Sequence, residues 1–339
     1  MDYKKILDRE EYSFLRTNEH LGDRIIYLTL SGSHSYGTNT EGSDIDIRGC
    51  ALERPRDLIG FSNFEQVVDK ATDTVIYSFN KLVGLLINCN PNVVEQLGCL
   101  PEHYLYVNDV GQNLIDNRKI FLSQRCIGSF GGYAYQQLNR LSNALARDRF
   151  DQAMKEEHIL NSLRSLIYTV EDRYGIDGKY IKMYIEDSNN EELEKEIFID
   201  IDLKRYPLRS VSGLLGEMNN ILKTYGKVNH RNKKKSNEGL NKHAMHLIRL
   251  YLTAIDMLEK EDIITYRGKD LDLLMKIRDG YFQKEDGTYD DSFEDLMNDL
   301  RKKFDYAAAN TNLPKNPDMD KIEEFVMEVN KKIILGDKY

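Results

Sequence analysis

One stretch near the N-terminus constrains this chain more than any other. The β-like run Arg24-Ile25-Ile26-Tyr27-Leu28-Thr29-Leu30 is typical of a strand and leads into a glycine-serine turn at Gly32-Ser33. Ten residues separate that pair from Asp44, which together with Asp46 flanks Ile45. Residues i and i+2 of a strand point to the same face, with Cα atoms about 6–7 Å apart. The pattern therefore predicts two neighbouring carboxylates beside a turn that is rich in free backbone N–H groups.

Carboxylate pairs are ligands that hard divalent cations prefer, and the N–H groups of a tight turn bind phosphate oxygens. Nucleotidyl transfer uses both features, because two metal ions about 4 Å apart can clamp the attacking and leaving oxygens. Two ions need more than two carboxylates, so we expect a third from a neighbouring strand. Asp73 is the best match because it opens a predicted strand over residues 72–77, and Asp69 is the alternative. The stretch predicts the catalytic end of a nucleotidyltransferase.

The glycine-serine turn also predicts where phosphates bind. Gly32 lets the backbone approach a phosphate closely, and the Ser33 hydroxyl can donate a hydrogen bond to it. Tyr36, Gly37 and Ser43 complete a small polar loop between the turn and the acidic pair. We interpret this loop as part of a nucleotide site rather than as an ordinary hairpin turn.

A second acidic pair, Asp200 and Asp202, repeats the pattern around Ile201. The residues before it, 191–196, form a charged, helix-like run and contain no glycine-serine turn. A strand with one solvated face accounts for this spacing. We therefore assign this pair a structural role.

The order of the predicted elements indicates an α+β chain. Strands over 24–31, 44–51 and 72–77, with helices over 79–87 and 93–97, indicate a small α/β unit. Later apolar residues recur at helical spacing over 128–148, 154–173, 211–224, 239–260, 268–279, 291–308 and 319–334. Only 197–204 reads as a strand there. We expect a catalytic domain with a small mixed sheet over 1–125, and a mostly helical domain over 126–339 that completes the cleft.

Composition narrows the partners and the compartment. The formal net charge of −9 argues against a basic surface that wraps duplex DNA. No apolar run approaches the ~20 residues of a membrane span, and the N-terminus has no secretory signal pattern. The cysteines show no CxxC spacing, which favours reduced, buried thiols; they are Cys50, Cys89, Cys99 and Cys126. These features predict a cytoplasmic protein without a membrane partner.

Positive charge is concentrated in two later segments. Lys242, His246 and Arg249 follow one another at i, i+4 and i+7, which places them on one stripe of the predicted helix over 239–260. Such a stripe can hold a leaving pyrophosphate, and Lys81 is a weaker candidate for the same role. The polar run over 226–238 contains Lys227, Arg231, Lys233, Lys234 and Lys235. A basic loop of this kind either binds the backbone of a single-stranded nucleic acid or is simply solvated.

These residues resemble a known superfamily. Gly32-Ser33 followed by Asp44-Ile45-Asp46 is similar to the signature of the DNA polymerase beta-like nucleotidyltransferases. The resemblance extends to the prokaryotic and phage branch described as RNA-repair-pathway-associated nucleotidyltransferases, whose Gly-Ser-His-x-Tyr-Gly pattern stands here at 32–37. Further matches cover most of the chain; they are Asp73, Lys81, Asn90-Pro91-Asn92 with Glu95, Lys242-His243-x-x-His246-x-x-Arg249, Ile277-Arg278-Asp279-Gly280 and Leu313-Pro314-x-x-Pro317.

The resemblance implies a polymerase beta-like domain that moves a nucleoside monophosphate from an NTP or dNTP with the help of two Mg²⁺ or Mn²⁺ ions. It implies that Asp44 and Asp46 bind both metals. Asp73 would bind the catalytic metal and activate the acceptor hydroxyl. These roles are expectations that come from the family and not from the spacing alone.

The resemblance also implies that Gly32, Ser33 and Ser43 cradle the β- and γ-phosphates. The chain departs from the family pattern at one position. Several minimal relatives carry arginine directly after the Gly-Ser pair, where this chain has His34. Histidine is neutral or charged depending on its surroundings, so this position is not a fixed source of positive charge for the triphosphate.

Three functions are compatible with these residues. The first is template-independent transfer to the end of an RNA, tRNA or DNA, or synthesis of a short oligonucleotide. The second is transfer to a small molecule or a protein hydroxyl, including self-labelling at Tyr339. The third is a non-catalytic, nucleotide-binding regulator. The intact pair Asp44 and Asp46 favours an enzyme, and the basic loop favours a nucleic-acid acceptor.

Overall fold

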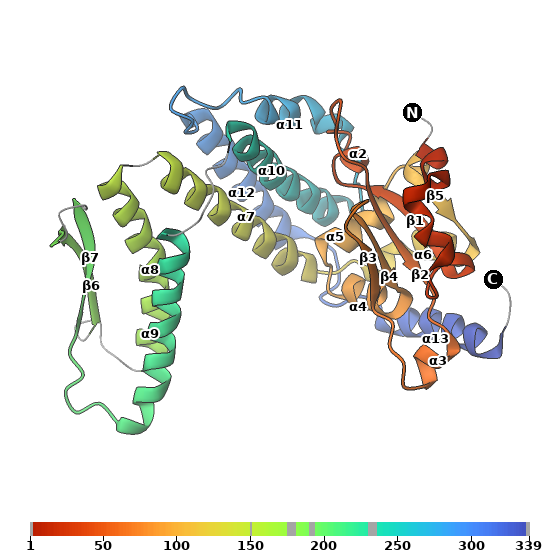
Figure 1. Cartoon of the computed structure of the whole chain (residues 1–339), viewed down its shortest axis with the longest axis horizontal. Helices are drawn as coiled ribbons and strands as arrows, with labels where there is room; N and C mark the ends of the chain where they lie inside the picture. Colours follow the sequence, from red (N-terminus) through yellow and green to blue (C-terminus); the bar gives the residue numbers. More distant parts are fainter. Residues whose placement is uncertain (1–2, 150, 175–180, 190–193, 230–235, 337–339) are drawn as a thin grey trace. The chain divides into compact units, whose positions relative to one another are not determined.

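The computed structural model describes residues 3–149, 151–174, 181–189, 194–229 and 236–336. The strands are β1 (Ile25–Ser31), β2 (Asp46–Ala51), β3 (Gln66–Asp69), β4 (Thr74–Ser78), β5 (Tyr104–Val107), β6 (Ile181–Asp187) and β7 (Lys195–Ile201). The α-helices are α1 (Phe14–Thr17), α2 (Gly32–Tyr36), α3 (Pro55–Ile59), α4 (Phe79–Ile87), α5 (Pro91–Val94), α6 (Asp109–Asp116), α7 (Arg125–Arg149), α8 (Gln152–Tyr174), α9 (Leu208–Asn229), α10 (Asn237–Lys260), α11 (Leu271–Arg278), α12 (Asp291–Asn310) and α13 (Met319–Leu335). Figure 1 shows these elements in a mixed α+β fold, which confirms the predicted fold class.

The chain forms two compact units. Unit 1 contains Met1–Gln137, Ala244–Tyr281 and Asp291–Tyr339, and unit 2 contains Leu138–His243 and Phe282–Asp290. The chain thus returns to unit 1 twice after leaving it. The sequence predicted a single boundary near residue 125, because local periodicity does not show which distant segments pack together.

Unit 1 is built on a five-stranded mixed sheet in the order β3-β4-β2-β1-β5. β2 pairs with β4 in parallel, and the other neighbouring strands are antiparallel. Leu28 and Leu30 of β1 belong to a buried cluster with Ile6 and Leu15 of the N-terminal segment. The Tyr27 hydroxyl, on the opposite face, donates to Gln96 at 2.8 Å. Because both faces of β1 are covered, apolar residues stand on both faces of this strand and do not alternate with polar ones.

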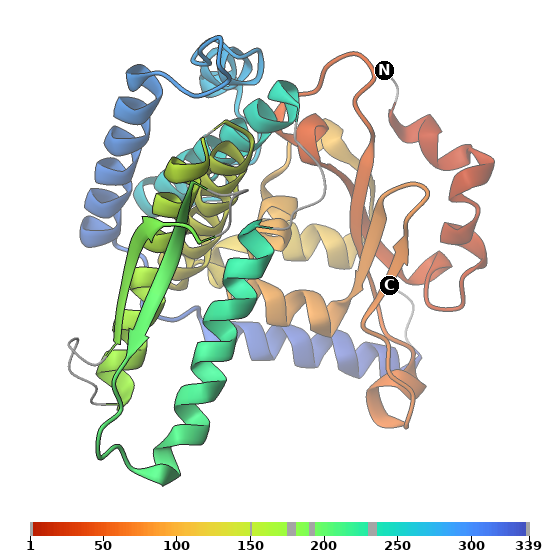
Figure 2. The ribbon, with the colours of Figure 1, turned by 60° about the vertical axis from the view of Figure 1, so that its left-hand side comes forward.

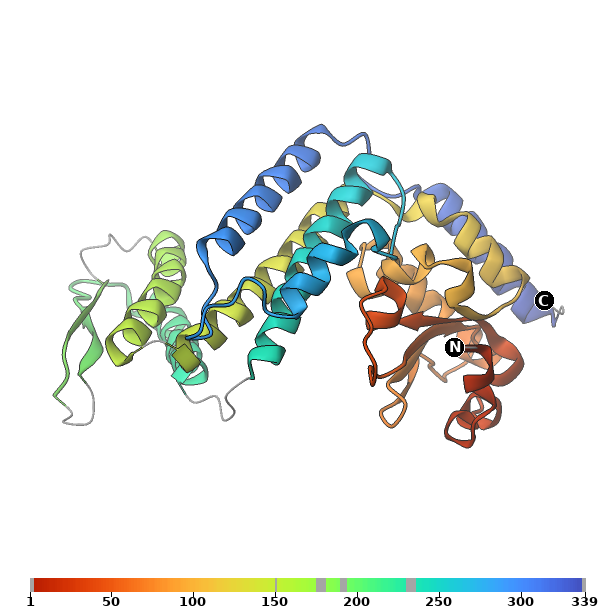
Figure 3. The ribbon, with the colours of Figure 1, turned by 90° about the horizontal axis from the view of Figure 1, so that it is seen from above.

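Side chains of β1 point alternately to the two faces of the sheet, and each face is covered by a layer of other elements. The N-terminal segment lies on one face of the sheet, and α4 and α6 lie on the other (Figure 2). The C-terminal helices α12 and α13, blue in Figure 3, also belong to this unit. Phe325 of α13 meets Phe79 of α4 edge-on, with ring centroids 5.7 Å apart. The last helix therefore supports the layer that covers the sheet.

Several predicted elements are confirmed. α4 occupies the predicted residues 79–87, and β1 and β4 match the predicted strands within two residues. The predicted strand over 44–51 begins only at Asp46. Its partner β1 ends at Ser31, where Gly32 turns into α2, so residues before Asp46 have no strand on that side. The short strands β3 and β5 and the hairpin strand β6 were not predicted.

Unit 2 contains the hairpin of β6 and β7, which packs against α8, and α9 packs against the same helix (Figure 1). Its core includes Ile159, Leu163, Ile181 and Leu214. Asp200 lies on β7 and accepts a hydrogen bond from the Tyr184 hydroxyl at 3.1 Å. Asp202 pairs with Lys204 at 3.1 Å. Both aspartates of the second acidic pair are thus exposed, on β7 and directly after it, and their structural role stays a prediction.

Within the described ranges, no helix is long and apolar enough to cross a membrane.

The free cysteines Cys50, Cys89 and Cys126 are buried and Cys99 is half-buried. Burial raises the pKa of the Cys99 thiol to about 12, so it stays protonated at neutral pH.

Candidate active site

Backbone pairing brings the predicted acidic residues to one end of the sheet of unit 1. Asp46 opens β2 opposite Ser31, the last residue of β1. Ile47 pairs with Thr74 across the parallel strands β2 and β4, so Asp46 and Asp73 stand immediately before this pair. The two carboxyl groups are close enough for a hydrogen bond between them to raise the pKa of Asp46. The glycine-serine turn and two of the predicted carboxylates therefore meet at one place.

Gly32 lies directly against the Asp46 carboxylate. Its φ of +59° is in the left-handed region, which glycine adopts without the strain of a Cβ atom. A Cβ at this position would lie 2.1 Å from Oδ2 of Asp46. Both the backbone and the neighbouring carboxylate thus require glycine here. Ser33, the next residue, is half-buried in the first turn of α2.

The environment of Asp46 favours its protonated form. Burial, the hydrogen bond with Asp73 and the negative charges of Asp73 and Asp44 raise the pKa of Asp46 to about 6 from the usual 3.8, while Arg48 lowers it. Two carboxyl groups in contact cannot both ionise freely without a positive partner. A bound cation would relieve this repulsion, which makes the pair suited to a divalent metal ion.

Arg48 fixes the position of Asp73. The φ of Asp73 is +43°, which is uncommon for a residue with a side chain. Nη2 of Arg48 donates to Oδ1 of Asp73 at 3.1 Å, and Nη1 donates to the main-chain carbonyl of the same residue. Arg48 lies two residues after Asp46 and therefore on the same face of β2. The sequence interpretation missed this arginine, although the two-residue spacing is a signal that points to it.

Asp44 and Asp69 occupy different surroundings. Asp44 is exposed in the loop before β2, close enough to Asp46 for its charge to affect that carboxyl. Asp69 ends β3, where it accepts hydrogen bonds from the backbone N–H of Thr72 at 2.9 Å and from its hydroxyl at 2.8 Å. Asp69 is therefore engaged in the turn between β3 and β4. Of the two alternatives for a third carboxylate, only Asp73 contacts Asp46.

Asp46 and Asp73 are the candidate ligands for a metal ion. Among the described residues, no three acidic, histidine or cysteine side chains form a ready-made metal site. Mg²⁺ is commonly held by one or two protein carboxylates, with substrate phosphates and water completing its shell. Asp46 and Asp73 meet that requirement, because their contacting oxygens are hard ligands whose mutual repulsion a cation removes. The residues fit a metal that binds together with a nucleotide.

The loop between α2 and β2 is braced from several sides. His34 is buried, with Nδ1 3.1 Å from the Tyr3 hydroxyl and Nε2 3.4 Å from the Ser43 carbonyl oxygen. Arg278 donates to the Thr38 carbonyl and, at 3.1 Å, to the Thr40 hydroxyl. The ring nitrogens of His34 are thus directed at protein groups. A role for His34 at the phosphates stays a prediction, whereas its contacts support the shape of the loop.

Tyr36 anchors the end of α2 through a buried ionic group. Its hydroxyl donates to Glu95 at 2.7 Å, and the other oxygen of Glu95 accepts from Arg249. The Arg249 guanidinium lies 3.7 Å from the centroid of the Tyr36 ring. Arg249 is 4% exposed, and burial raises the pKa of Tyr36 well above its usual range. Arg249 was predicted to hold phosphate. In this arrangement its guanidinium donates to Glu95 and lies over the ring of Tyr36.

Gly37 is the C-cap of α2 and lies close to the ring of Tyr266. Its φ is +80°, and a Cβ at this position would lie 2.5 Å from the ring of Tyr266. The backbone N–H of Arg267 donates to the Tyr36 carbonyl at 3.0 Å. The segment 266–267, which the sequence interpretation did not single out, therefore supports the end of α2. The predicted roles of Tyr36 and Gly37 at the nucleotide stay predictions.

The remaining predicted residues lie in several elements. Lys81 of α4 pairs with Glu65 at 3.3 Å on the surface of unit 1. His246 is half-buried on the part of α10 that belongs to unit 1, whereas Lys242 is exposed in unit 2. Lys227 belongs to α9. Four predicted residues of the basic loop and the predicted labelling site lie outside the described residues; they are Arg231, Lys233, Lys234, Lys235 and Tyr339.

The raised pKa of Asp46 predicts a pH-dependent stability of the metal-free protein. Because the folded-state pKa of about 6 exceeds the usual 3.8, the folded protein binds the proton more tightly than the unfolded chain. The stabilisation from this group is present below about pH 4 and is lost as the pH rises towards 6. Thermal unfolding in EDTA across this range should show the loss in the wild type and not in Asp46→Asn.

The difference between the two proteins isolates this carboxyl, because all other titrating groups are shared. Addition of Mg²⁺ at pH 7 should raise the melting temperature of the wild type and leave Asp46→Asn unchanged. Parallel stability curves for the two proteins between pH 4 and 7 would show that Asp46 titrates normally.

A comparison with protein-family models identifies the relatives of this chain. The model RlaP, described as the RNA repair pathway DNA polymerase beta family, matches residues 7–328. Comparisons with curated proteins and with solved structures found no match. The matched range includes the turn at Gly32, the contacting pair Asp46 and Asp73, and the buried group around Glu95. The chain therefore belongs to the RNA repair pathway DNA polymerase beta family, a branch of the polymerase beta-like nucleotidyltransferases.

Proposed function

We propose that this protein is a metal-dependent, template-independent nucleotidyltransferase that moves a nucleoside monophosphate from an NTP or dNTP to a nucleic-acid hydroxyl and releases pyrophosphate. The observation that carries the proposal is the contact between Gly32, Asp46 and Asp73 at one end of the sheet. It combines a close backbone approach for phosphates with two carboxylates that favour a cation.

Each residue has a defined task in the proposed reaction. The backbone at Gly32 and the hydroxyl of Ser33 hold the β- and γ-phosphates, and Ser43 lines the same loop. Asp44, Asp46 and Asp73 would hold the cations, which would supply positive charge for the phosphates of the substrate. Asp73 also accepts the proton of the attacking hydroxyl. Its side chain is more exposed than that of Asp46, and Arg48 holds it in orientation.

The nucleic-acid acceptor is supported by the basic residues that follow α9. Lys227 belongs to that helix, and four more basic residues follow it in the sequence over 231–235. Cationic side chains bind phosphate backbones with an affinity that falls steeply with salt. We therefore expect transfer to single-stranded RNA or DNA to weaken as the salt concentration rises.

The experiment combines the purified protein with Mg²⁺ or Mn²⁺ and each α-labelled NTP and dNTP, with and without RNA and DNA oligonucleotides. Label on the oligonucleotide supports the proposal. Label on the protein or on a small molecule means that the acceptor is different. If no condition releases pyrophosphate in a manner that Asp44→Ala with Asp46→Ala abolishes, the protein is not an active transferase and its fold serves only to bind nucleotides.

Gly32→Ala tests the turn separately from the carboxylates. The added Cβ would lie 2.1 Å from the Asp46 carboxylate, so Asp46 must move. A displacement of about 1 Å in a catalytic group reduces the rate by about 10²-fold. Gly336→Ala is the matched control, because Gly336 also has a positive φ of +77° but has no atom within 4 Å of an added Cβ. Equal rates for the two variants would contradict the role of this contact.

A further inference from the structure

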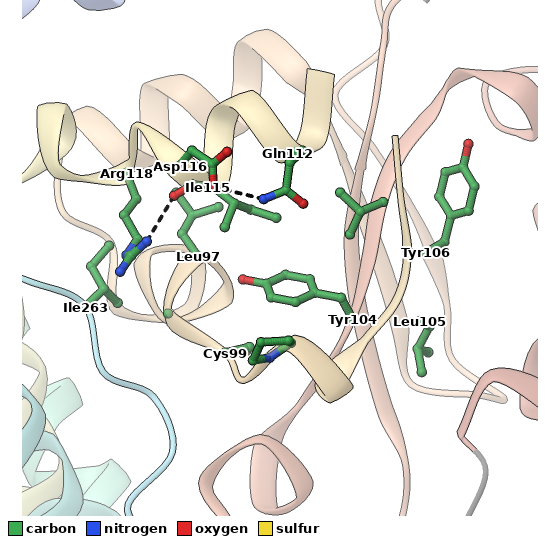
Figure 4. A pocket seen from close by; sticks show the side chains of 13 residues that line it. Leu97, Cys99, Tyr104, Leu105, Tyr106, Gln112, Ile115, Asp116, Arg118 and Ile263 are labelled. Atoms are coloured by element: carbon green, nitrogen blue, oxygen red, sulfur yellow. Dashed lines mark hydrogen bonds between the residues drawn. The ribbon is translucent and has the colours of Figure 1, made fainter. Parts of the chain in front are cut away.

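Unit 1 contains a cavity of about 520 Å³ that is separate from the acidic residues. Its walls come from the loop after η4 (Glu95–Gly98), from β5 and from α6, with Ile263 closing one side. Figure 4 shows Tyr104 extending beneath α6, with Gln112 and Asp116 above it. None of Asp44, Asp46 and Asp73 lines this cavity. It is within the size range of small-molecule sites in proteins.

The cavity is held open by interactions in its walls. Arg118 donates to both carboxylate oxygens of Asp262, at 2.8 and 3.0 Å, and this fixes the segment that carries Ile263. A Cβ at Gly98 would lie 2.5 Å from Ile263, so glycine permits the close approach of the two segments. The Thr265 N–H donates to the Gly98 carbonyl at 3.1 Å. The site therefore does not depend on a ligand for its shape.

The polar groups along the α6 wall are mainly acceptors. Gln112 donates its amide N–H to Oδ1 of Asp116 at 2.9 Å, and the Gln112 carbonyl, Oδ2 of Asp116 and the second lone pair of Oδ1 can accept from other donors. Arg118 also lines the cavity, but its charge is matched by Asp262. The Tyr104 hydroxyl donates to the Gln96 carbonyl at 2.8 Å. A ligand of this wall must therefore bring N–H donors.

The remaining lining is apolar and suits a flat ring. Leu97, Leu105, Ile115 and Ile263 provide aliphatic surface, and Tyr104 provides an aromatic ring. Nucleobases combine a planar ring with hydrogen-bonding groups at one edge. Guanine alone among the four RNA bases presents two adjacent N–H donors on its Watson–Crick edge, N1–H and the 2-amino group, and a carboxylate can accept both.

We propose that this cavity binds the guanine base of a nucleotide, with Asp116 accepting N1–H and the 2-amino group and Gln112 accepting a further donor at the rim. Binding requires no metal ion, because the contacts are made to the base. The site is additional to the proposed transferase site and does not rest on it. The guanine belongs either to a free nucleotide or to an unpaired end of an RNA strand.

The experiment measures equilibrium binding of GMP, IMP, AMP, CMP and UMP by calorimetry in EDTA. GMP should bind saturably and at least about tenfold more tightly than AMP, because one bidentate contact discriminates between bases by about that factor. IMP, which lacks the 2-amino group, should bind more weakly than GMP. Asp116→Asn should abolish the preference for GMP, whereas Glu102→Gln, a matched loss of charge at an exposed residue outside the cavity, should retain it.

Asp44→Ala with Asp46→Ala separates this site from the transferase site, since GMP binding should persist in that variant even if no transfer activity exists. A single-stranded oligonucleotide with a terminal guanosine, compared with one ending in adenosine, distinguishes the two sources. Tighter Asp116-dependent binding of the oligonucleotide than of GMP identifies an RNA end, and the reverse identifies a free nucleotide. Absence of saturable GMP binding, equal binding of AMP, or unchanged binding by Asp116→Asn overturns the proposal.

Discussion

Asp46→Asn should reduce the rate of nucleotidyl transfer by about 10³-fold, because loss of metal stabilisation removes ~4 kcal/mol from the transition state. Asp46 is the residue through which the site is connected, since it contacts Gly32 on one side and Asp73 on the other. Asparagine has nearly the same shape, but its neutral carbonyl oxygen and NH2 group replace the carboxylate and remove the negative charge. Release of labelled pyrophosphate at saturating Mg²⁺ and NTP measures the effect.

Asp200→Asn provides the matched control for this loss. Asp200 lies in the same Asp-Ile-Asp pattern, but on the surface hairpin of unit 2, where it accepts from Tyr184. Asparagine retains an acceptor for that hydroxyl, so stability and rate should both remain close to the wild type. A comparable loss of rate in Asp200→Asn would show that the wrong one of the two Asp-Ile-Asp patterns had been assigned to catalysis.

Glu95→Gln should produce the largest loss of stability. The carboxylate of Glu95 is the partner of the buried Arg249 guanidinium, and their side chains are 6% and 5% exposed. Removal of one partner leaves an uncompensated buried charge, which costs about 3–5 kcal/mol. A fall of about 10 °C in the melting temperature is expected. Because Tyr36 donates to the same carboxylate, the end of α2 should loosen as well.

A double-mutant cycle identifies the cause of this loss. Arg249→Met alone should also be strongly destabilising, whereas the combination with Glu95→Gln should cost less than the sum, because both charges are then absent. Glu65→Gln is the control for an exposed pair with Lys81, 60% and 40% exposed, whose loss costs about 0–1 kcal/mol. Additive effects of the two buried substitutions would mean that the pair is not coupled.

The local parts of the fold and site could be predicted from the sequence. The run 25–30 is apolar apart from Thr29 because both faces of β1 are covered, and α4 follows from helical spacing after the Ser78 cap. Gly32 and Asp46 were recognisable because the turn and the carboxylate are close in the sequence. Asp73 was selected because it opens a predicted strand, and it lies at the same sheet edge as Asp46 because β4 runs parallel to β2.

Features that depend on distant packing could not be predicted. In the sequence, Arg249 looks like part of a cationic stripe. Its burial depends on pairing with Glu95, which lies 154 residues earlier in the chain and gives no local signal. β5 is a four-residue edge strand whose pairing with β1 is set by tertiary contacts. The return of the chain to unit 1 after α9 has no local signal. The cavity beside β5 was missed for the same reason, since its walls come from separate segments.

The position of a bound metal and nucleotide tests the central claim most directly. Crystals grown with Mn²⁺ and a non-hydrolysable NTP, measured at the manganese absorption edge, would locate the ion without reference to activity. The account predicts an anomalous peak bound by Asp46 and Asp73, with the β- and γ-phosphates against the backbone at Gly32 and Ser33. A nucleotide bound elsewhere in the chain, or manganese absent from these two carboxylates, would contradict it.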